Sequence, residues 1–104
     1  IVNIASTLQY IENWQHLLHQ ISSYKPEAII ISNTPVTGYQ TYARVQTNGR
    51  NRRIPAWCFC QAYLDGVLGT YGYRRGYYME HNQSLHHKNA PGPAVQASMI
   101  YYPN

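Results

Sequence analysis

Three histidines in the last third of the chain could bind a metal ion: His81, His86 and His87. A preformed zinc site holds such ligands at fixed spacings on rigid elements, because the ion prefers a tetrahedral geometry. These three lie in a polar segment rich in Pro and Gly, without the i, i+4 spacing of a helix, and Glu80 is the one acid beside them. The sequence therefore predicts no metal site, and solvated histidines are the simpler interpretation.

Two basic segments could bind an anion. Arg50-Asn51-Arg52-Arg53 could hold phosphate, because a guanidinium presents a planar fork to oxyanions. The segment Tyr71–Tyr78 places Arg74 and Arg75 among tyrosines, as in proteins that bind single-stranded nucleic acids. A solvated loop and tyrosines lining a sheet edge are the plainer interpretations. The net charge of +4 is weak for a nucleic-acid binder, which favours the plainer ones.

The two cysteines, Cys58 and Cys60, are too close in sequence to close a structural loop. On the helix expected here their thiols would point about 160° apart, so two free thiols are predicted rather than a redox pair. A reducing compartment is then the default.

A strand, a helix and a second strand are predicted before residue 36. Ile1–Ala5 is a short β-branched run, and apolar residues then recur at steps of three and four from Tyr10 to Ile21, which predicts a helix of about 14 residues. Pro26 marks the break, and the apolar run Ala28–Ser32 is the second strand, ending at 33–35. Both strands are apolar on successive residues, which predicts a parallel sheet covered on both faces.

The middle of the chain is expected to be a long loop followed by a helix. Residues 36–55 show no sustained period and carry several Gly, Pro and Arg residues, so they are predicted to form a surface loop. Ala56–Tyr71 places most of its apolar residues on one helical face and is followed by Gly72, a helix-ending residue. Trp57 is expected in the core with Trp14.

Two aromatic or apolar strands end the chain, at 76–80 and 94–102, and we expect them to pair as a wide antiparallel hairpin. The predicted fold is therefore α/β in the order strand, helix, strand, helix, strand, strand, with two parallel strands and a C-terminal antiparallel hairpin. Residues 1–104 form one partial domain, which begins as if cut from a longer protein. The longest apolar runs are far below the roughly 20 residues that cross a bilayer, so no membrane role is expected.

This order of elements resembles the second half of a class I, Rossmann-like S-adenosylmethionine-dependent methyltransferase domain, most closely a group of bacterial methyltransferase-like proteins with a Ser-x-Leu-Gln-Tyr-Ile segment. The matching segments are Val2–Ser6 with Leu8-Gln9-Tyr10-Ile11, Pro26–Ile31, Leu64–Tyr73 with Tyr71-Gly72-Tyr73, and the strands 76–80 and 94–102. The resemblance covers nearly the whole chain and implies a cytoplasmic bacterial protein.

The resemblance also implies where ligands bind. Cofactor-binding residues would be Asn3, Ala5, Ser6 and Thr7, and Tyr10 and Pro35 would face the methyl acceptor. The Gly-rich loop and the acidic strand end that hold the cofactor in this family are missing, so this chain alone should bind S-adenosylmethionine weakly or not at all. Methyl transfer needs alignment more than acid or base catalysis, so no catalytic residue is assigned.

Two further hypotheses follow from the sequence. The chain could instead be a non-enzymatic binding module for an anionic partner, nucleic acid or glycan, with the Arg-rich segment and the tyrosines as its surface. If Ile1–Ala5 is a central strand whose neighbour is missing, its free edge should recruit a second copy, which predicts a homodimer through the first strand. The methyl acceptor itself, a small molecule or a glycan, cannot be read from these residues.

Overall fold

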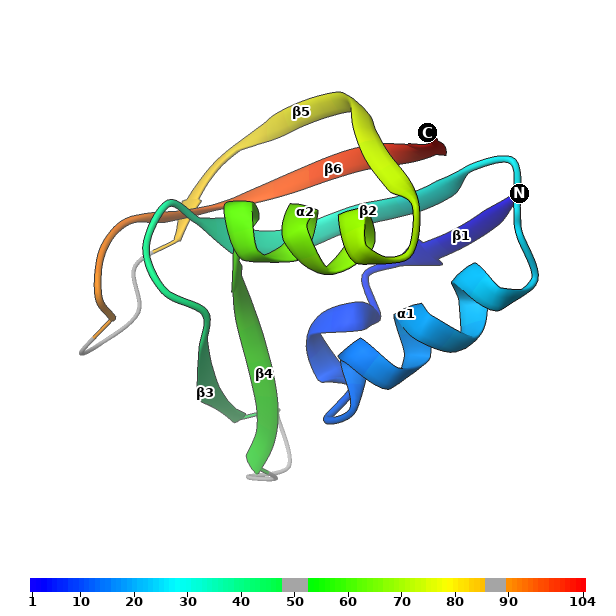
Figure 1. The fold of residues 1–104 in the computed structure, drawn as a ribbon. Helices are drawn as coiled ribbons and strands as arrows, with labels where there is room; N and C mark the ends of the chain where they lie inside the picture. The colour runs from blue at the N-terminus through cyan, green and yellow to red at the C-terminus, as the bar shows by residue number, and fades with distance from the viewer. Residues whose placement is uncertain (48–52, 86–89) are drawn as a thin grey trace.

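The computed structural model describes residues 1–47, 53–85 and 90–104, with the backbone alone at 45–47, 53–55 and 82–85. The described residues form an α/β fold with a mixed six-stranded sheet and two α-helices (Figure 1). The elements are β1 (Val2–Ala5), the 3₁₀ turn η1 (Leu8–Tyr10), α1 (Trp14–Ser23), β2 (Ile29–Thr37), β3 (Tyr42–Thr47), β4 (Arg53–Cys60), α2 (Gln61–Thr70), β5 (Tyr73–Leu85) and β6 (Ala94–Pro103). The expected α/β class is thus confirmed.

The first three predicted elements form a parallel unit. β1 pairs in parallel with the first half of β2, from Val2 opposite Ile29 to Ala5 opposite Ser32, and α1 connects them. The helix is shorter than expected, since the periodic residues around Tyr10 form the separate turn η1. The second strand is longer than expected because it continues through a register shift near Asn33 to Thr37.

The predicted C-terminal hairpin is also confirmed, with longer strands than the apolar runs indicated. β5 and β6 pair antiparallel, and β6 also pairs antiparallel with β2. The sheet order is therefore β3-β4-β2-β6-β5, with β1 on the same edge of β2 as β4. β6, the last strand of the chain, lies between two strands that run opposite to it.

The loop expected at 36–55 is wrong, and so is the start of the following helix. β3 and β4 form an antiparallel hairpin that pairs Tyr42–Thr47 with Arg53–Cys58, and α2 begins only at Gln61. β4 contacts the main sheet through its last two residues, which lie beside Val36 and Thr37. The rest of the hairpin extends away from the sheet as an arm (Figure 1).

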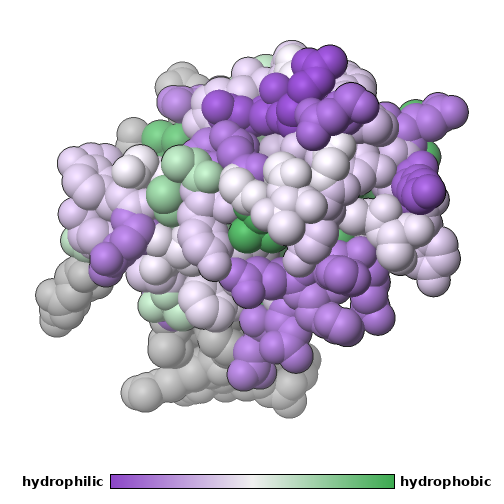
Figure 2. Space-filling model, in the orientation of Figure 1, coloured by the Kyte–Doolittle hydropathy of each residue, from purple (hydrophilic) through white to green (hydrophobic). Residues whose placement is uncertain are grey.

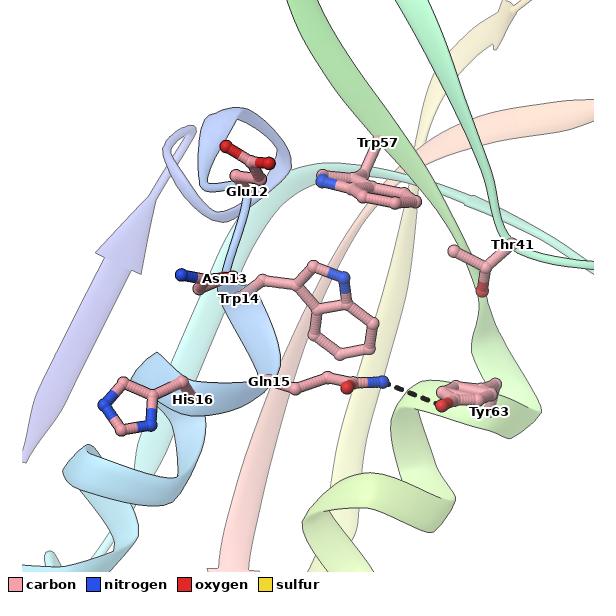
Figure 3. A pocket seen from close by; sticks show the side chains of 8 residues that line it. All are labelled: Glu12, Asn13, Trp14, Gln15, His16, Thr41, Trp57 and Tyr63. Atoms are coloured by element: carbon pink, nitrogen blue, oxygen red, sulfur yellow. Dashed lines mark hydrogen bonds between the residues drawn. The ribbon is translucent and has the colours of Figure 1, made fainter.

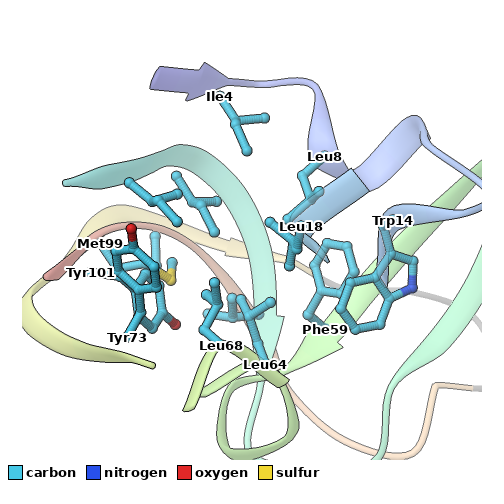
Figure 4. Close-up of a cluster of buried hydrophobic side chains, with 14 residues drawn as sticks. Ile4, Leu8, Trp14, Leu18, Phe59, Leu64, Leu68, Tyr73, Met99 and Tyr101 are labelled. Atoms are coloured by element: carbon cyan, nitrogen blue, oxygen red, sulfur yellow. The ribbon is translucent and has the colours of Figure 1, made fainter. Parts of the chain in front are cut away.

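The hydrophobic core lies on one face of the sheet, where both helices pack. Its buried side chains include Trp14 and Leu18 of α1, Leu64 and Leu68 of α2, and Phe59 of β4 (Figure 4). Residues 97, 99 and 101 of β6 are buried, whereas 98 and 100 between them are only partly buried. The expectation of a sheet covered on both faces is therefore wrong for β1, which alternates between buried and exposed positions, but it agrees with the end of β2, which is buried on consecutive residues from Thr34 to Thr37.

The helix-bearing face is coloured mostly purple to white, with small green patches (Figure 2). Neither described helix is long and apolar enough to cross a membrane.

Candidate functional site

The four residues expected to border the cofactor lie at the carboxyl end of β1, and all are exposed: Asn3, Ala5, Ser6 and Thr7. Ser6 has a φ of 51°, and Asn33, at the bend in β2, has a φ of 55°. Such left-handed conformations are costly for residues other than glycine and concentrate at functional sites. The Asn33 Nδ2 donates a hydrogen bond of 3.0 Å to Ser6 Oγ, so the two strained residues hold each other at this edge.

Asn33 also connects this edge to β6 and β5. Its backbone N–H donates to Ser98 Oγ at 3.0 Å, and Ser98 Oγ lies 2.7 Å from His81 Nε2. A chain of polar contacts thus runs from Ser6, just after β1, through Asn33 of β2 and Ser98 of β6 to His81 of β5. The sequence reasoning missed Asn33 and Ser98, although a polar residue within each apolar run could have drawn attention to them.

The predicted cofactor residues do not form a complete site for S-adenosylmethionine within the described residues. None of the four lines any of the three cavities described here. The Thr7 hydroxyl donates to Ala5 O at 2.6 Å, which uses its only proton within the turn. These residues can supply an exposed wall, but no carboxylate stands among them to bind ribose hydroxyls.

The two predicted acceptor-facing residues are separated. Pro35 is buried within β2, opposite Gln96 of β6. Tyr10 is 42% exposed and lines a cavity of about 260 Å³ with Glu12, Ala43 and Trp57. Only Tyr10 therefore lies where a ligand can reach it.

A larger cavity of about 460 Å³ adjoins this one, since Glu12 and Trp57 line both. We call the two cavities together the aromatic groove. It lies between the start of α1, the β3–β4 arm and the first turn of α2. The larger cavity is lined by Glu12, Asn13, Trp14, Gln15, His16, Thr41, Trp57 and Tyr63 (Figure 3).

Trp57, which was expected in the core, packs against the edge of the core cluster while one part of it faces the groove. It lies on β4 opposite Ala43 of β3, and it is only partly buried. Its neighbour Phe59 is fully buried and packs edge to face against Trp14, with ring centroids 4.8 Å apart. The small side chain of Ala43 leaves the Trp57 ring accessible at the groove.

Two hydroxyl groups in the groove are fixed by protein donors. Gln15 Nε2 donates to the Tyr63 hydroxyl at 2.7 Å, and the backbone N–H of Cys60 donates to Thr41 Oγ1 at 2.8 Å. Each hydroxyl thus accepts a bond from the protein and retains its own proton as a donor. In Figure 3 the Trp57 ring lies on one side of Trp14 and the Gln15–Tyr63 pair on the other.

A polar cluster fastens α2 to the sheet. The buried Tyr101 hydroxyl donates to Asp65 Oδ1 at 2.6 Å, and Gln61 Nε2 donates to Asp65 Oδ1 at 2.8 Å and to the Tyr101 hydroxyl at 3.0 Å. Burial, and next the bond to the Asp65 carboxylate, raise the pKa of Tyr101 well above its usual range. Of these side chains Gln61 lines a cavity of about 450 Å³, together with Arg75.

The basic residues of β5 are partly neutralised. Arg75 Nη2 lies 3.5 Å from Asp65 Oδ2, and its guanidinium stands 4.8 Å from the centroid of the Tyr78 ring. The Tyr78 hydroxyl donates to Glu80 Oε2 at 3.0 Å. Tyr73, Tyr77 and Tyr78 lie on β5, the last strand in the order of the sheet, as the plainer interpretation expects, whereas Tyr71 caps the end of α2. Arg50, Asn51 and Arg52 lie outside the described residues.

The two cysteines and the histidines were the other candidate residues in the sequence. Cys58 and Cys60 lie on β4 rather than on a helix, as free thiols, and burial raises the pKa of the Cys58 thiol. His86 and His87 lie outside the described residues. Within the part of the chain that is described, no three His, Cys, Asp or Glu side chains gather as metal ligands would.

Comparison with known proteins gives no relative: no family model, no curated protein and no solved structure matches this chain.

Proposed function

We propose that this chain is part of a class I S-adenosylmethionine-dependent methyltransferase domain, the part that holds the methyl acceptor and one wall of the cofactor site. The order of the elements carries this proposal. A parallel β1–α1–β2 unit is followed by α2 and by a hairpin whose last strand lies against β2. The resemblance noted in the sequence implies the same succession of two parallel strands and a closing antiparallel pair.

Ligands of open α/β sheets bind beyond the carboxyl ends of the strands, where in this proposal the acceptor meets the cofactor. The Asn33–Ser6 hydrogen bond would keep the turn after β1 rigid there. The segment that leaves this turn leads through Tyr10 to Glu12, which both line the aromatic groove. The β3–β4 arm is an insertion between β2 and α2 and forms the opposite wall, a common position for specificity.

S-adenosylmethionine, when bound, supplies a methyl group on an activated sulfonium, which leaves the protein mainly the task of alignment. The described residues do not complete a site for it, so the proposal requires a Gly-rich half-domain. The reading frame upstream of Ile1 tests this requirement. We expect a strand, a Gly-rich turn and, about 20 residues further on, an acidic strand end. An upstream frame without this pattern would contradict the proposal.

The position of the cofactor wall is tested in the protein that this longer reading frame encodes. Ala5→Leu adds bulk to the exposed end of β1 without the left-handed strain that Ser6→Leu would add. We expect each variant to weaken S-adenosylmethionine binding at least about 10-fold by calorimetry. Ala62→Leu, on the exposed side of α2, is the matched control and should bind normally. Unchanged affinity in both β1 variants would show that the wall lies elsewhere.

A further inference from the structure

The aromatic groove has the chemistry of a site for a neutral, hydroxyl-rich ligand. Its described lining includes amide, hydroxyl, imidazole and carboxylate side chains beside the Trp57 ring, and it includes no lysine or arginine. An anionic ligand would find no lysine or arginine among the described residues that line the groove. A purely apolar ligand would leave the polar groups of Gln15, Thr41 and Tyr63 without partners, which costs binding energy.

A cation is the next alternative, because an indole ring beside a carboxylate can attract one. A cation interacts only with hydrogen-bond acceptors and negative charge, however, whereas the larger cavity also offers several hydrogen-bond donors that a cation would leave without partners. The hydroxyls of Tyr63 and Thr41 each accept a hydrogen bond from the protein, so each can donate its own proton to a ligand. Among the described residues the Trp57 indole N–H also has no hydrogen-bond partner, and in Figure 3 it lies on the side of Glu12. This mixture of donors with one carboxylate matches a polyol, whose hydroxyls donate and accept.

We propose that the aromatic groove binds a carbohydrate ring. The apolar face of the sugar stacks on Trp57, and its hydroxyls bond to Glu12, Gln15, Thr41 and Tyr63. The Glu12 carboxylate has no hydrogen-bond or ion-pair partner among the described residues, so it can accept from two neighbouring hydroxyls at once. Trp57 lies on a strand and Tyr63 on a helix, and regular elements position side chains more precisely than loops do.

This inference deepens the proposed function, since it names the class of the methyl acceptor. The role of the sugar as acceptor rests on the proposed function, but its binding does not. Binding of the sugar itself requires only the groove, which the described chain contains. The test is therefore made on the 104-residue chain without cofactor. The probes are methyl glycosides of common hexoses and N-acetylhexosamines, followed by tryptophan fluorescence and saturation-transfer NMR.

We expect at least one glycoside to bind with a Kd of about 0.1–10 mM, and Trp57→Ala to weaken it at least about 10-fold. Glu12→Gln and Tyr63→Phe should weaken it several-fold and, being conservative changes at exposed side chains, also serve if Trp57→Ala fails to fold. Tyr24→Ala is the control, because that side chain is 84% exposed at the far end of α1. It should bind like the unaltered chain.

Three outcomes would overturn the inference. The first is the absence of saturable binding for the whole panel up to about 50 mM. The second is binding that Trp57→Ala and Glu12→Gln leave unchanged. The third is saturable binding of tetramethylammonium chloride or inorganic phosphate in place of the glycosides. Sugar binding by an extended protein that does not bind S-adenosylmethionine would refute the proposed function alone, and cofactor binding without sugar binding would refute this inference alone.

Discussion

At the scale of single residues, the chain uses polar groups to fix positions that its apolar pattern leaves undetermined. The Asn33–Ser6 bond holds two left-handed residues together, and Tyr101 holds α2 through Asp65. Buried tyrosines of this kind favour the neutral phenol, because burial penalises the charged form. The pKa values of Tyr42, Tyr73 and Tyr78 are raised for the same leading reason.

These tyrosines predict a loss of stability in alkali. A tyrosine ionises near pH 10 in the unfolded chain and at higher pH in the folded one. Its contribution to stability is therefore fully present below about pH 10 and is lost as the pH rises above that value. Urea unfolding followed by circular dichroism between neutral pH and about pH 11.5 should show this decline.

Tyr101→Phe separates the two effects of the Tyr101 hydroxyl. The variant should lose about 1–2 kcal/mol at neutral pH, because the bond to Asp65 is missing. It should then lose less stability than the unaltered chain as the pH rises above about 10. Tyr24→Phe, at an exposed position, should follow the unaltered chain. Parallel curves for Tyr101→Phe and the unaltered chain would contradict this account.

At the scale of elements, the sequence predicts those helices and strands whose apolar residues follow one clear periodicity along their whole length. The β1–α1–β2 unit and the pairing of the last two strands follow from apolar runs and one amphipathic stretch, and both are found. The helix predicted from Ala56 is wrong for residues 56–60, because their apolar pattern fits a strand with period 2 as well as a helix with period 3.6. The structure changes from strand to helix after Cys60. That change puts Trp57 on a strand, where it packs against the core and also lines the aromatic groove.

The β3–β4 hairpin was missed for a related reason. β3 carries Arg44 and Gln46 on alternate positions, and β4 is a continuous apolar run after Arg53, so the two strands share no single period. The Asn48-Gly49 dipeptide was the available signal, because this pair favours tight turns between strands. The part of the candidate site that the hairpin supplies, Trp57 above all, could not be recognised without it, whereas Tyr10, which was expected to face the acceptor, lines a cavity.

The pairing of β5 with β6 depends on one glycine. Gly76 lies at a register shift, and a Cβ added there would stand 2.5 Å from Cδ2 of Tyr102, whose ring covers it. Gly76→Ala should lower the free energy of unfolding by about 1–3 kcal/mol, since the ring must move. In a Tyr102→Ala background the same change should cost much less, which a double-mutant cycle measures.

Gly66→Ala provides the control for this experiment. Gly66 is exposed within α2, and an added Cβ would meet nothing within 4 Å. The substitution should therefore stabilise the protein by about 0.5–1 kcal/mol, because alanine favours helix. Equal costs of Gly76→Ala with and without the Tyr102 ring would show that the contact does not matter and that backbone strain at the register shift does.

At the scale of the whole molecule, one sheet face and one strand edge are left without partners among the described residues. Both helices cover the same face, and Tyr77, Met79 and Tyr102 of the hairpin remain 46%, 45% and 38% exposed. β1 pairs with β2 alone within the described part of the chain. Since an unpaired apolar edge invites a further strand, the fold favours association.

We therefore predict that the 104-residue chain dimerises through β1. The backbone N–H of Val2 donates to Ala28 O, just before β2, at 3.0 Å, and that of Ser6 donates to Ser32 O at 2.9 Å, so the N–H groups of Asn3 and Ala5 point to the free edge. Asn3→Pro removes one outward backbone donor and leaves the backbone hydrogen bonds to β2 in place, although it also removes the 3.5 Å bond from Ser32 Oγ of β2 to Asn3 Oδ1. Sedimentation at about 50 μM should show a dimer for the unaltered chain and a shift to monomer for Asn3→Pro, with unchanged circular dichroism.

Two results would argue against pairing through this edge. Monomer alone at that concentration would mean that the short β1 edge is too small to hold a second copy. A dimer that survives Asn3→Pro but dissociates in Tyr77→Lys would place the interface on the open sheet face, where a charge would have to be buried. In that case the side chains of the β5–β6 hairpin, rather than backbone hydrogen bonds at β1, would supply the association energy, and the dimer would depend weakly on Asn3.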